Sequence, residues 1–139
     1  GIVLKRELLY IPFYGWYLWR AAAIPIDRGG GGDALRRMVR DARQTLVENR
    51  SILIFPEGTR QKPGAAPDYK PGVAGLYAML HVPCVPVALN SGVYWQGFIK
   101  KPGTIVLEFL EPIPAGLRRP QFMALLEQRI ETATAALLP

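Results

Sequence analysis

Cysteine and histidine are scarce in this sequence, with one of each among 139 residues, and this scarcity excludes several kinds of site. A single cysteine forms no internal disulfide and no cysteine-rich zinc site. A single histidine excludes a metal site with two histidine ligands and leaves His81 as the sole histidine available as a general base. The pattern places His81 at a helix end, and Cys84 lies in an apolar run typical of a buried packing residue.

Long apolar runs and charged tracts are also missing. No run reaches the ~18 uninterrupted apolar residues that a membrane-spanning helix needs, and no signal-peptide layout is present. Hydrophobic residues make up 50% and charged residues 20% of the chain, which excludes a disordered tail and fits one domain with a buried core. The chain begins at Gly1 rather than Met, so we expect that an upstream piece is missing.

The net charge is +6 and is unevenly distributed along the chain. Residues 1–70 carry 12 basic and 7 acidic side chains, whereas residues 71–139 carry 5 and 4. A basic N-terminal half favours an anionic partner, which could be a nucleic acid, a phosphorylated small molecule or an acidic lipid surface. The sequence has no aromatic-basic single-strand motif and no recognition helix, so we predict that it binds no nucleic acid.

Aromatic side chains are concentrated in residues 8–26, and Lys5, Arg6, Arg20 and Arg28 flank them. Aromatic residues with basic neighbours favour the headgroup zone of a bilayer, which predicts contact with a membrane surface. The alternative is an amphipathic helix packed in the core. The six aromatic residues of this segment are Tyr10, Phe13, Tyr14, Trp16, Tyr17 and Trp19.

Apolar periodicity predicts strands that alternate with helices. Strands are expected at residues 1–4, 51–55, 82–88 and 104–110, with an edge strand or no strand at 24–27. Helices are expected at 13–22, after an N-cap at Asp33, from Pro71 and from Pro120. Residues 29–32 are predicted to form a loop, and residues 91–103 to be irregular. The alternation predicts an α/β fold with a mostly parallel central sheet flanked by helices.

Charged residues follow three of the predicted strands, at the edge where open α/β sheets bind ligands. Lys5, Arg28 and Arg60 are therefore expected to converge on one anion, since arginine and lysine both bind phosphate. A Glu57 carboxylate beside these cations could accept a hydrogen bond from a ligand hydroxyl. The alternative for Glu57 is a structural ion pair with a neighbouring arginine.

The six residues Phe55-Pro56-Glu57-Gly58-Thr59-Arg60 resemble the FPEGTR signature of the glycerophosphate acyltransferase family, in particular its bacterial 1-acylglycerol-3-phosphate acyltransferases. The resemblance covers nearly the whole chain. It extends to Lys5-Arg6-Glu7-Leu8, to Ile11 through Trp16, to Ile24 through Arg28, to Tyr69-Lys70-Pro71-Gly72 and to Val85-Pro86-Val87-Ala88.

The resemblance implies transfer of a fatty acyl group from acyl-CoA or acyl-carrier protein to the free hydroxyl of lysophosphatidic acid, which gives phosphatidic acid without a cofactor or metal. It implies that Arg60 and Lys5 hold the phosphate, that Arg28 adds positive charge, and that Glu57, Gly58 and Thr59 shape the glycerol pocket. Residues 85–88 would lie by the acyl chain or support the site from the core. The expected location is the cytoplasmic face of the inner membrane.

Two departures from the family pattern matter. Ala22 and Pro25 stand where the family usually has glycine and an aromatic residue. The catalytic His-x-x-x-x-Asp motif is missing, because His81 follows the FPEGTR residues and Pro86 stands five positions after it. We therefore expect residues 1–139 to be a single acyltransferase domain without its N-terminal part, lacking that motif and the first strand. The catalytic residues stay unknown, and the chain alone is expected to be inactive.

Two other functions stay open at this point. One is a lipid- or phosphate-binding domain that never had the His/Asp pair. The other is a related acyltransferase that acts on glycerol-3-phosphate or on a lipid A precursor.

Overall fold

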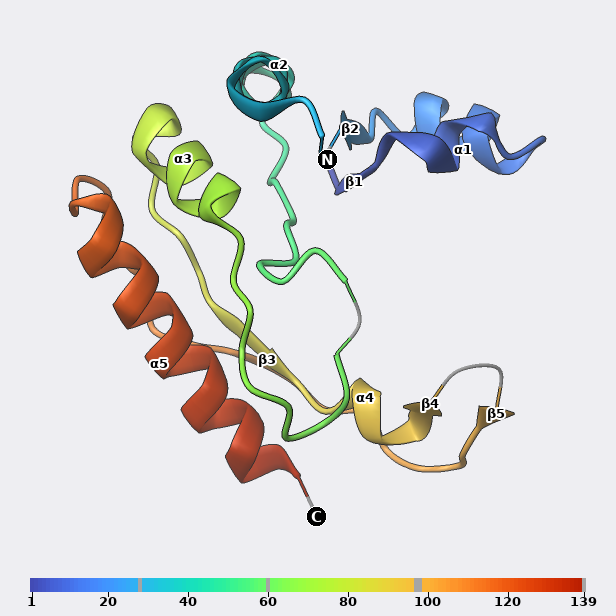
Figure 1. Ribbon diagram of the computed structural model, residues 1–139, viewed down its shortest axis with the longest axis vertical. Coiled ribbons are helices and arrows are strands. Elements are labelled where there is room, and N and C mark those ends of the chain that lie inside the picture. Colours follow the sequence, from blue (N-terminus) through green and yellow to red (C-terminus); the bar gives the residue numbers. More distant parts are fainter. Residues whose placement is uncertain (28, 60, 97–98, 139) are drawn as a thin grey trace.

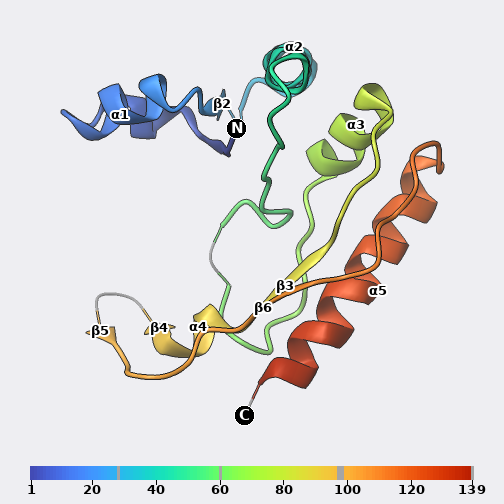
Figure 2. The same cartoon turned by 180° about the vertical axis from the view of Figure 1, so that it is seen from behind.

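The computed structural model describes residues 1–27, 29–59, 61–96 and 99–138. The elements run in the order β1 (Val3–Lys5), the 3₁₀ helix η1 (Arg6–Tyr10), α1 (Tyr14–Arg20), β2 (Ile24–Ile26), α2 (Gly31–Val47), α3 (Pro71–Leu80), β3 (Val87–Leu89), α4 (Ser91–Tyr94), β4 (Trp95–Gln96), β5 (Ile99–Lys100), β6 (Leu107–Phe109) and α5 (Arg119–Leu137). This mixture confirms the α/β class. Helices α3 and α5 lie side by side, and α1 projects from the opposite side of the molecule (Figures 1 and 2).

Short strands form three separate pairs among the described residues. β1 pairs with β2 in parallel, and residues 52–55 join them through a parallel bridge between Ile2 and Leu53. β3 pairs with β6, and β4 with β5, in antiparallel register. The predicted parallel pairing therefore holds around β1 and not beyond it. β6 returns to β3 without a crossover helix, and such a connection gives antiparallel neighbours.

Three predicted strands are shorter than expected. The strand predicted at 82–88 is reduced to β3 and a separate bridge at Cys84. The segment 51–55 makes a single bridge, at Leu53. The strand predicted at 104–110 is reduced to β6, and just before β6 the side-chain Oδ1 of Asn90 accepts the backbone N–H of Val106 at 2.8 Å. The region predicted to be irregular contains α4 and the β4–β5 hairpin.

The four predicted helices are present, and α3 and α5 each have the expected proline in the first turn. The prediction that Asp33 caps a helix was wrong, because α2 begins two residues earlier, at Gly31. The backbone N–H of Ala34 donates to the carbonyl of Gly30 at 3.2 Å, so the glycine run supplies the first turn. Asp33 lies within that turn and pairs with Arg36 at 3.5 Å. Its carboxylate still favours the positive end of the helix dipole.

The core consists of two hydrophobic clusters. The first joins β1, β2, α2 and α3, and its buried members are Val3, Ile24, Met38, Val39, Ala42 and Leu76. The second joins α3 to α5, and its buried members are Val73, Ala74, Tyr77, Ile113, Phe122 and Leu126. The rings of Tyr77 and Phe122 stack with their centroids 3.8 Å apart. Ile54 packs against both clusters and so links the two halves.

Residues 6–20, comprising η1 and α1, form a projecting segment that we call the aromatic arm. Gly15 lets α1 lie directly on η1, because a Cβ atom at this position would be 1.9 Å from the carbonyl oxygen of Leu9. Most of the aromatic side chains face solvent, with exposed fractions of 90% for Phe13, 67% for Trp16 and 71% for Trp19. The arm is therefore not an amphipathic helix packed in the core, which was the alternative that the sequence allowed.

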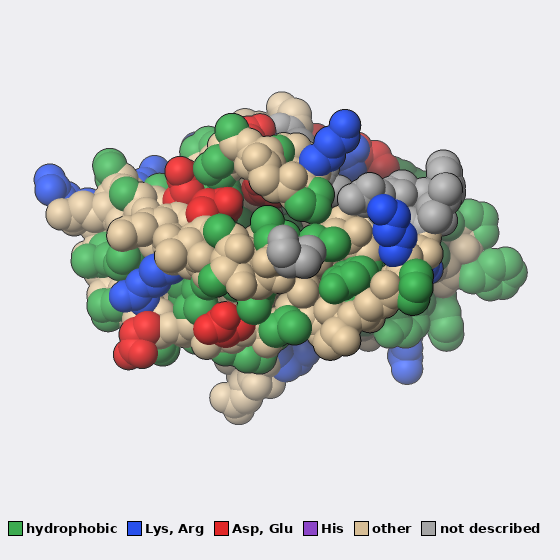
Figure 3. All heavy atoms as spheres, turned by 90° about the horizontal axis from the view of Figure 1, so that it is seen from below, with side chains coloured by type: hydrophobic (Ala, Val, Ile, Leu, Met, Phe, Trp, Pro, Cys, Tyr) green, Lys and Arg blue, Asp and Glu red, His purple; other side chains and the backbone are tan. Residues whose placement is uncertain are grey.

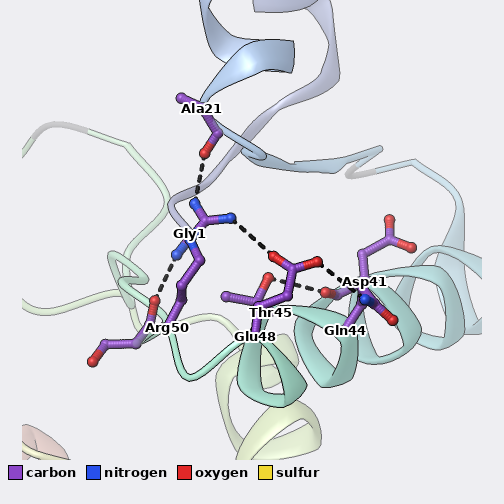
Figure 4. Close-up of polar contacts among 8 residues, drawn as sticks. Gly1, Ala21, Asp41, Gln44, Thr45, Glu48 and Arg50 are labelled. Carbon is purple, nitrogen blue, oxygen red and sulfur yellow. Dashed lines mark hydrogen bonds and ion pairs between the residues drawn. The ribbon is translucent and has the colours of Figure 1, made fainter.

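The C-terminal end of α1 is closed by a Schellman motif with alanine at its left-handed position. The N–H of Ala23 donates to the carbonyl of Leu18, and the N–H of Ala22 donates to the carbonyl of Trp19, both at 3.0 Å. Ala22 has a φ of 49°, a conformation that glycine adopts at lower cost than alanine. The arginine Nη2 of Arg50 donates to the carbonyl of Ala21 at 2.7 Å, which ties this end to the body (Figure 4).

We predict that Ala22→Gly stabilises the chain by about 1 kcal/mol, because it removes the steric cost of the left-handed conformation. Urea unfolding followed by circular dichroism measures this change. Ala21→Gly is the matched control, because Ala21 has an ordinary φ of −76°. That substitution should destabilise the chain by roughly 0.5–1 kcal/mol. Destabilisation by both substitutions would contradict the strain assigned to Ala22.

Candidate active site

The carboxyl ends of β1, β2 and segment 52–55 lie at one edge of the parallel strands. Lys5 pairs with Ile26 in register, and Asp27 follows directly. Leu53 pairs with Ile2, so the chain reaches Pro56 at this same edge. The register therefore brings together the segments that carry Lys5 and Glu57. The other two predicted cations, Arg28 and Arg60, lie outside the described residues.

Lys5 is available at this edge. Its side chain is 47% exposed, and its ammonium lies 3.8 Å from a carboxylate oxygen of Glu7. Beside it is a hollow of about 280 Å³ lined by Arg6, Glu7, Tyr10 and Asp27. The sequence pattern did not lead us to predict Arg6 or Asp27 as site residues. The signal was nevertheless present, since Arg6 stands within the Lys-Arg-Glu-Leu block and Asp27 immediately precedes Arg28.

The Pro56–Thr59 segment is a tight turn that depends on glycine. Gly58 has a φ of 65°, a conformation that a side chain disfavours. Its N–H donates to the carbonyl of Phe55 at 3.0 Å. The carbonyl of Pro56 accepts the N–H of Lys70 at 2.9 Å, which closes the intervening loop. Glu57 and Gly58 are partly buried, and Thr59 is exposed. The turn therefore holds a carboxylate and a hydroxyl at this edge of the strands.

Glu57 has an environment that favours its protonated form. Partial burial raises the pKa of this carboxyl, and the nearby carboxylates of Glu131 and Asp68 raise it further. The backbone of Asp68 and the Lys70 ammonium lower the pKa of Glu57 but do not outweigh burial. A carboxyl poised in this way can accept a hydrogen bond from a hydroxyl group when ionised and donate one when protonated.

His81 and Cys84 have the structural positions predicted for them. His81 ends α3 in the left-handed conformation, with a φ of 54°. Cys84 forms an antiparallel bridge with Ile113 and packs against the second cluster. Burial raises the pKa of its thiol, which disfavours the thiolate that a nucleophile needs. Residues 85–88 lead into β3, where Pro86 and Ala88 are buried.

A family model described as Acyltransferase matches residues 1–90. The chain belongs to the acyltransferase family. The match covers the Lys5 segment, β2 and the Pro56–Thr59 turn, so the candidate site lies wholly inside it. The resemblance carried by the FPEGTR residues is therefore confirmed.

Curated relatives within the acyltransferase family include a 1-acyl-sn-glycerol-3-phosphate acyltransferase from Pseudomonas aeruginosa. It is 39% identical over 131 residues, which are 93% of this chain and 51% of the relative. The 1-acyl-sn-glycerol-3-phosphate acyltransferase alpha of Homo sapiens is 32% identical over 133 residues, or 92% and 46% of the two chains. The chain thus spans about half the length of the curated relatives it matches.

A crystal structure of the 1-acyl-sn-glycerophosphate (LPA) acyltransferase PlsC from Thermotoga maritima has the same fold. The TM-score is 0.75 at 21% sequence identity, and the match covers 99% of this chain and 56% of that one. The family relationship and the fold are thus established by separate comparisons. Among the described residues, we find no helix with the length and hydropathy to cross a bilayer.

We predict that Glu57→Gln gains stability relative to the parent chain as the pH rises. A carboxyl whose pKa is raised in the folded state binds more protons folded than unfolded, so the parent loses stability as the pH rises through this range. Glutamine does not titrate and removes that loss. Urea unfolding of both proteins at several values between about pH 3.5 and about pH 7 measures the difference. A difference that changes in the opposite direction would indicate a stabilising ion pair at Glu57.

Proposed function

We propose that this chain forms the acceptor-binding part of an enzyme that acylates lysophosphatidic acid to phosphatidic acid. The acyl donor would be acyl-CoA or acyl-carrier protein. The observation that carries this proposal is the Pro56–Thr59 turn, in which a partly buried Glu57 lies at the same strand edge as the exposed ammonium of Lys5. The names of the curated relatives support the choice of acceptor.

In this proposal the basic residues bind the phosphate, and the turn that carries Glu57 binds the glycerol. Lys5 and Arg60 bind the phosphate group of the acceptor, and Arg28 adds to the positive potential. Glu57, with Gly58 and Thr59, orients the glycerol hydroxyls. Each charge-assisted hydrogen bond to the phosphate contributes ~1.5–3 kcal/mol, so loss of one cation weakens binding without abolishing it.

The chemical step needs a general base that these residues do not supply. The sequence contains no His-x-x-x-x-Asp pair, and His81 ends α3 rather than following a site strand. General-base catalysis contributes ~10²–10⁴-fold, so the 139 residues alone are expected to transfer acyl groups undetectably. We therefore propose that they are the part of an acyltransferase domain that holds the acceptor. Robust transfer by the purified chain would contradict this division of roles.

A second candidate is a lipid-binding domain without catalysis. The observation that favours it is the same missing His/Asp pair. The two candidates share the phosphate site and differ in whether an in-frame His-x-x-x-x-Asp motif is encoded directly upstream of Gly1. The upstream coding sequence distinguishes them.

The aromatic arm supports a further part of the proposal, which is contact with a membrane surface at its cytoplasmic face. Hydrophobic side chains gather at the right-hand edge of Figure 3, the edge where α1 lies in Figure 1. The arm ends at Arg20 and begins at Arg6, so cations flank its exposed aromatic rings. Indole and phenol rings with basic neighbours favour the interfacial zone of an anionic bilayer.

We predict that Arg60→Ala weakens binding of lysophosphatidic acid by ~1.5–3 kcal/mol, because a bidentate contact to the phosphate is lost. Isothermal titration below the critical micelle concentration measures the affinity. Arg60→Lys should bind with intermediate affinity, since lysine keeps the charge and loses the planar fork. Arg40→Ala is the control, because Arg40 pairs with Asp41 on the exposed face of α2. Unchanged affinity in Arg60→Ala would remove Arg60 from the site.

We predict that Trp16→Ala and Trp19→Ala each reduce sedimentation of the chain with vesicles of phosphatidylglycerol and phosphatidylethanolamine. Each substitution removes an exposed indole from the arm without opening a cavity in the core. The matched control is Phe109→Ala, because Phe109 is 72% exposed and lies on β6. Equal loss in all three variants, or no loss in the two tryptophan variants, would refute membrane contact through the arm.

A further inference from the structure

Residues 68–70 connect the Pro56–Thr59 turn to the start of α3. The N–H of Lys70 donates to the carbonyl of Pro56 at 2.9 Å, and the backbone of Asp68 is near enough to the Glu57 carboxyl to lower its pKa. Lys70 also pairs with the carboxylate of Asp68. The backbone of this short segment therefore fixes the turn that carries Glu57. A contact that fixes the position of residues 68–70 therefore also affects the position of the turn that carries Glu57.

Tyr69 supplies such a contact from the middle of the segment. Its hydroxyl donates to Oε1 of Glu131, on α5, at 2.9 Å. Its ring packs against the second cluster, on which α5 also packs. Burial and the carboxylates of Glu131, Glu57 and Glu127 raise the pKa of the Tyr69 hydroxyl, so it stays protonated and remains a donor. The partners Tyr69 and Glu131 are 62 positions apart in the sequence.

Glu131 is also close enough to Glu57 to influence it electrostatically. Its carboxylate is one of the causes of the raised pKa of Glu57, alongside the carboxylate of Asp68, and the Lys70 ammonium acts against both. A carboxylate on α5 therefore affects the ionisation of Glu57, and its hydrogen bond to Tyr69 links α5 to residues 68–70. The family model ends at residue 90, so α5 lies outside the part of the chain that it matches.

We propose that Tyr69 and Glu131 are positioning residues for the acyl acceptor, and that their hydrogen bond holds the Glu57 turn against α5. The proposal rests on the proposed function, in which Glu57 orients the glycerol of lysophosphatidic acid. It assigns to the C-terminal helix a role in acceptor binding. Neither residue touches the acceptor, because each acts through residues 68–70 and Glu57.

A purely structural role for this hydrogen bond makes a different prediction. Loss of a partly buried hydrogen bond lowers the stability of any fold. The chain offers a control in which only stability should change, because the Tyr77 hydroxyl is also partly buried and hydrogen-bonded. It donates to the carbonyl of Pro114 and accepts the N–H of Leu117 at 3.0 Å. Tyr77→Phe should therefore destabilise the chain without altering Glu57.

The test compares Tyr69→Phe, Glu131→Leu, Glu131→Gln and Tyr77→Phe in the full chain. Isothermal titration gives the affinity for lysophosphatidic acid, and a ¹³C NMR titration of the side-chain carboxyl gives the pKa of Glu57. We expect Tyr69→Phe and Glu131→Leu each to weaken binding roughly 3- to 10-fold and to shift the Glu57 resonance. The double variant Tyr69→Phe/Glu131→Leu should bind no more weakly than either single variant, since each single substitution already removes the same hydrogen bond. Glutamine at residue 131 keeps an acceptor for the Tyr69 hydroxyl and should restore affinity.

The outcomes are distinguishable. Parent-like affinity and an unshifted Glu57 resonance in Tyr69→Phe and Glu131→Leu would overturn the positioning role, whatever their stability. Equal weakening in Tyr77→Phe would overturn it too, since that variant leaves residues 68–70 untouched. If the parent chain fails to bind lysophosphatidic acid while Tyr69→Phe still shifts the Glu57 resonance, the proposed function fails and the coupling of α5 to Glu57 stands.

Discussion

The packing of Ile54 between the two hydrophobic clusters is the contact on which the site depends. One cluster joins β1, β2 and α2 to α3, and the other joins α3 to α5, so Ile54 and α3 together hold the two halves against each other. The turn that carries Glu57 begins two residues later, at Pro56. A displacement of Ile54 would therefore move Glu57 relative to Lys5, which belongs to the first half. The packing of apolar side chains therefore sets the position of the polar groups of the candidate site.

Electrostatics then gives these positioned groups their chemistry. Residues 1–70 carry a basic excess, and Lys5 is exposed at the strand edge where we propose that the acceptor phosphate binds. Glu57 is placed differently, because burial and the carboxylates of Asp68 and Glu131 favour its protonated form. In the proposed function, the exposed cation would bind the charged phosphate of lysophosphatidic acid, and the carboxyl with the raised pKa would bind its neutral glycerol.

The sequence predicted features that are encoded locally. Pro71 and Pro120 marked helix starts correctly, because proline is favoured in the first turn. The features that it missed depend on distant contacts. The side chain of Asn90 accepts the N–H of Val106 just before β6, and no local pattern at residues 104–110 reveals this contact.

In the candidate site, too, some features are encoded locally and others depend on distant contacts. Six contiguous residues indicated where its turn lies, and Ala22 has a left-handed φ that glycine adopts at lower cost. The contact of Tyr69 with Glu131 joins residues 62 positions apart, so sequence spacing could not indicate it. Arg28 and Arg60 lie outside the described residues, and their roles stay predictions from the motif.

The most direct test of the account compares lysophosphatidic acid with a monoacylglycerol of the same acyl chain, which lacks only the phosphate. Isothermal titration of the 139-residue chain with each lipid, at two salt concentrations, measures the contribution of the phosphate. The account predicts saturable binding of lysophosphatidic acid that weakens with salt, and binding of the monoacylglycerol that is at least roughly tenfold weaker, since charge-assisted hydrogen bonds are lost. Equal, salt-independent affinity for the two lipids would contradict it.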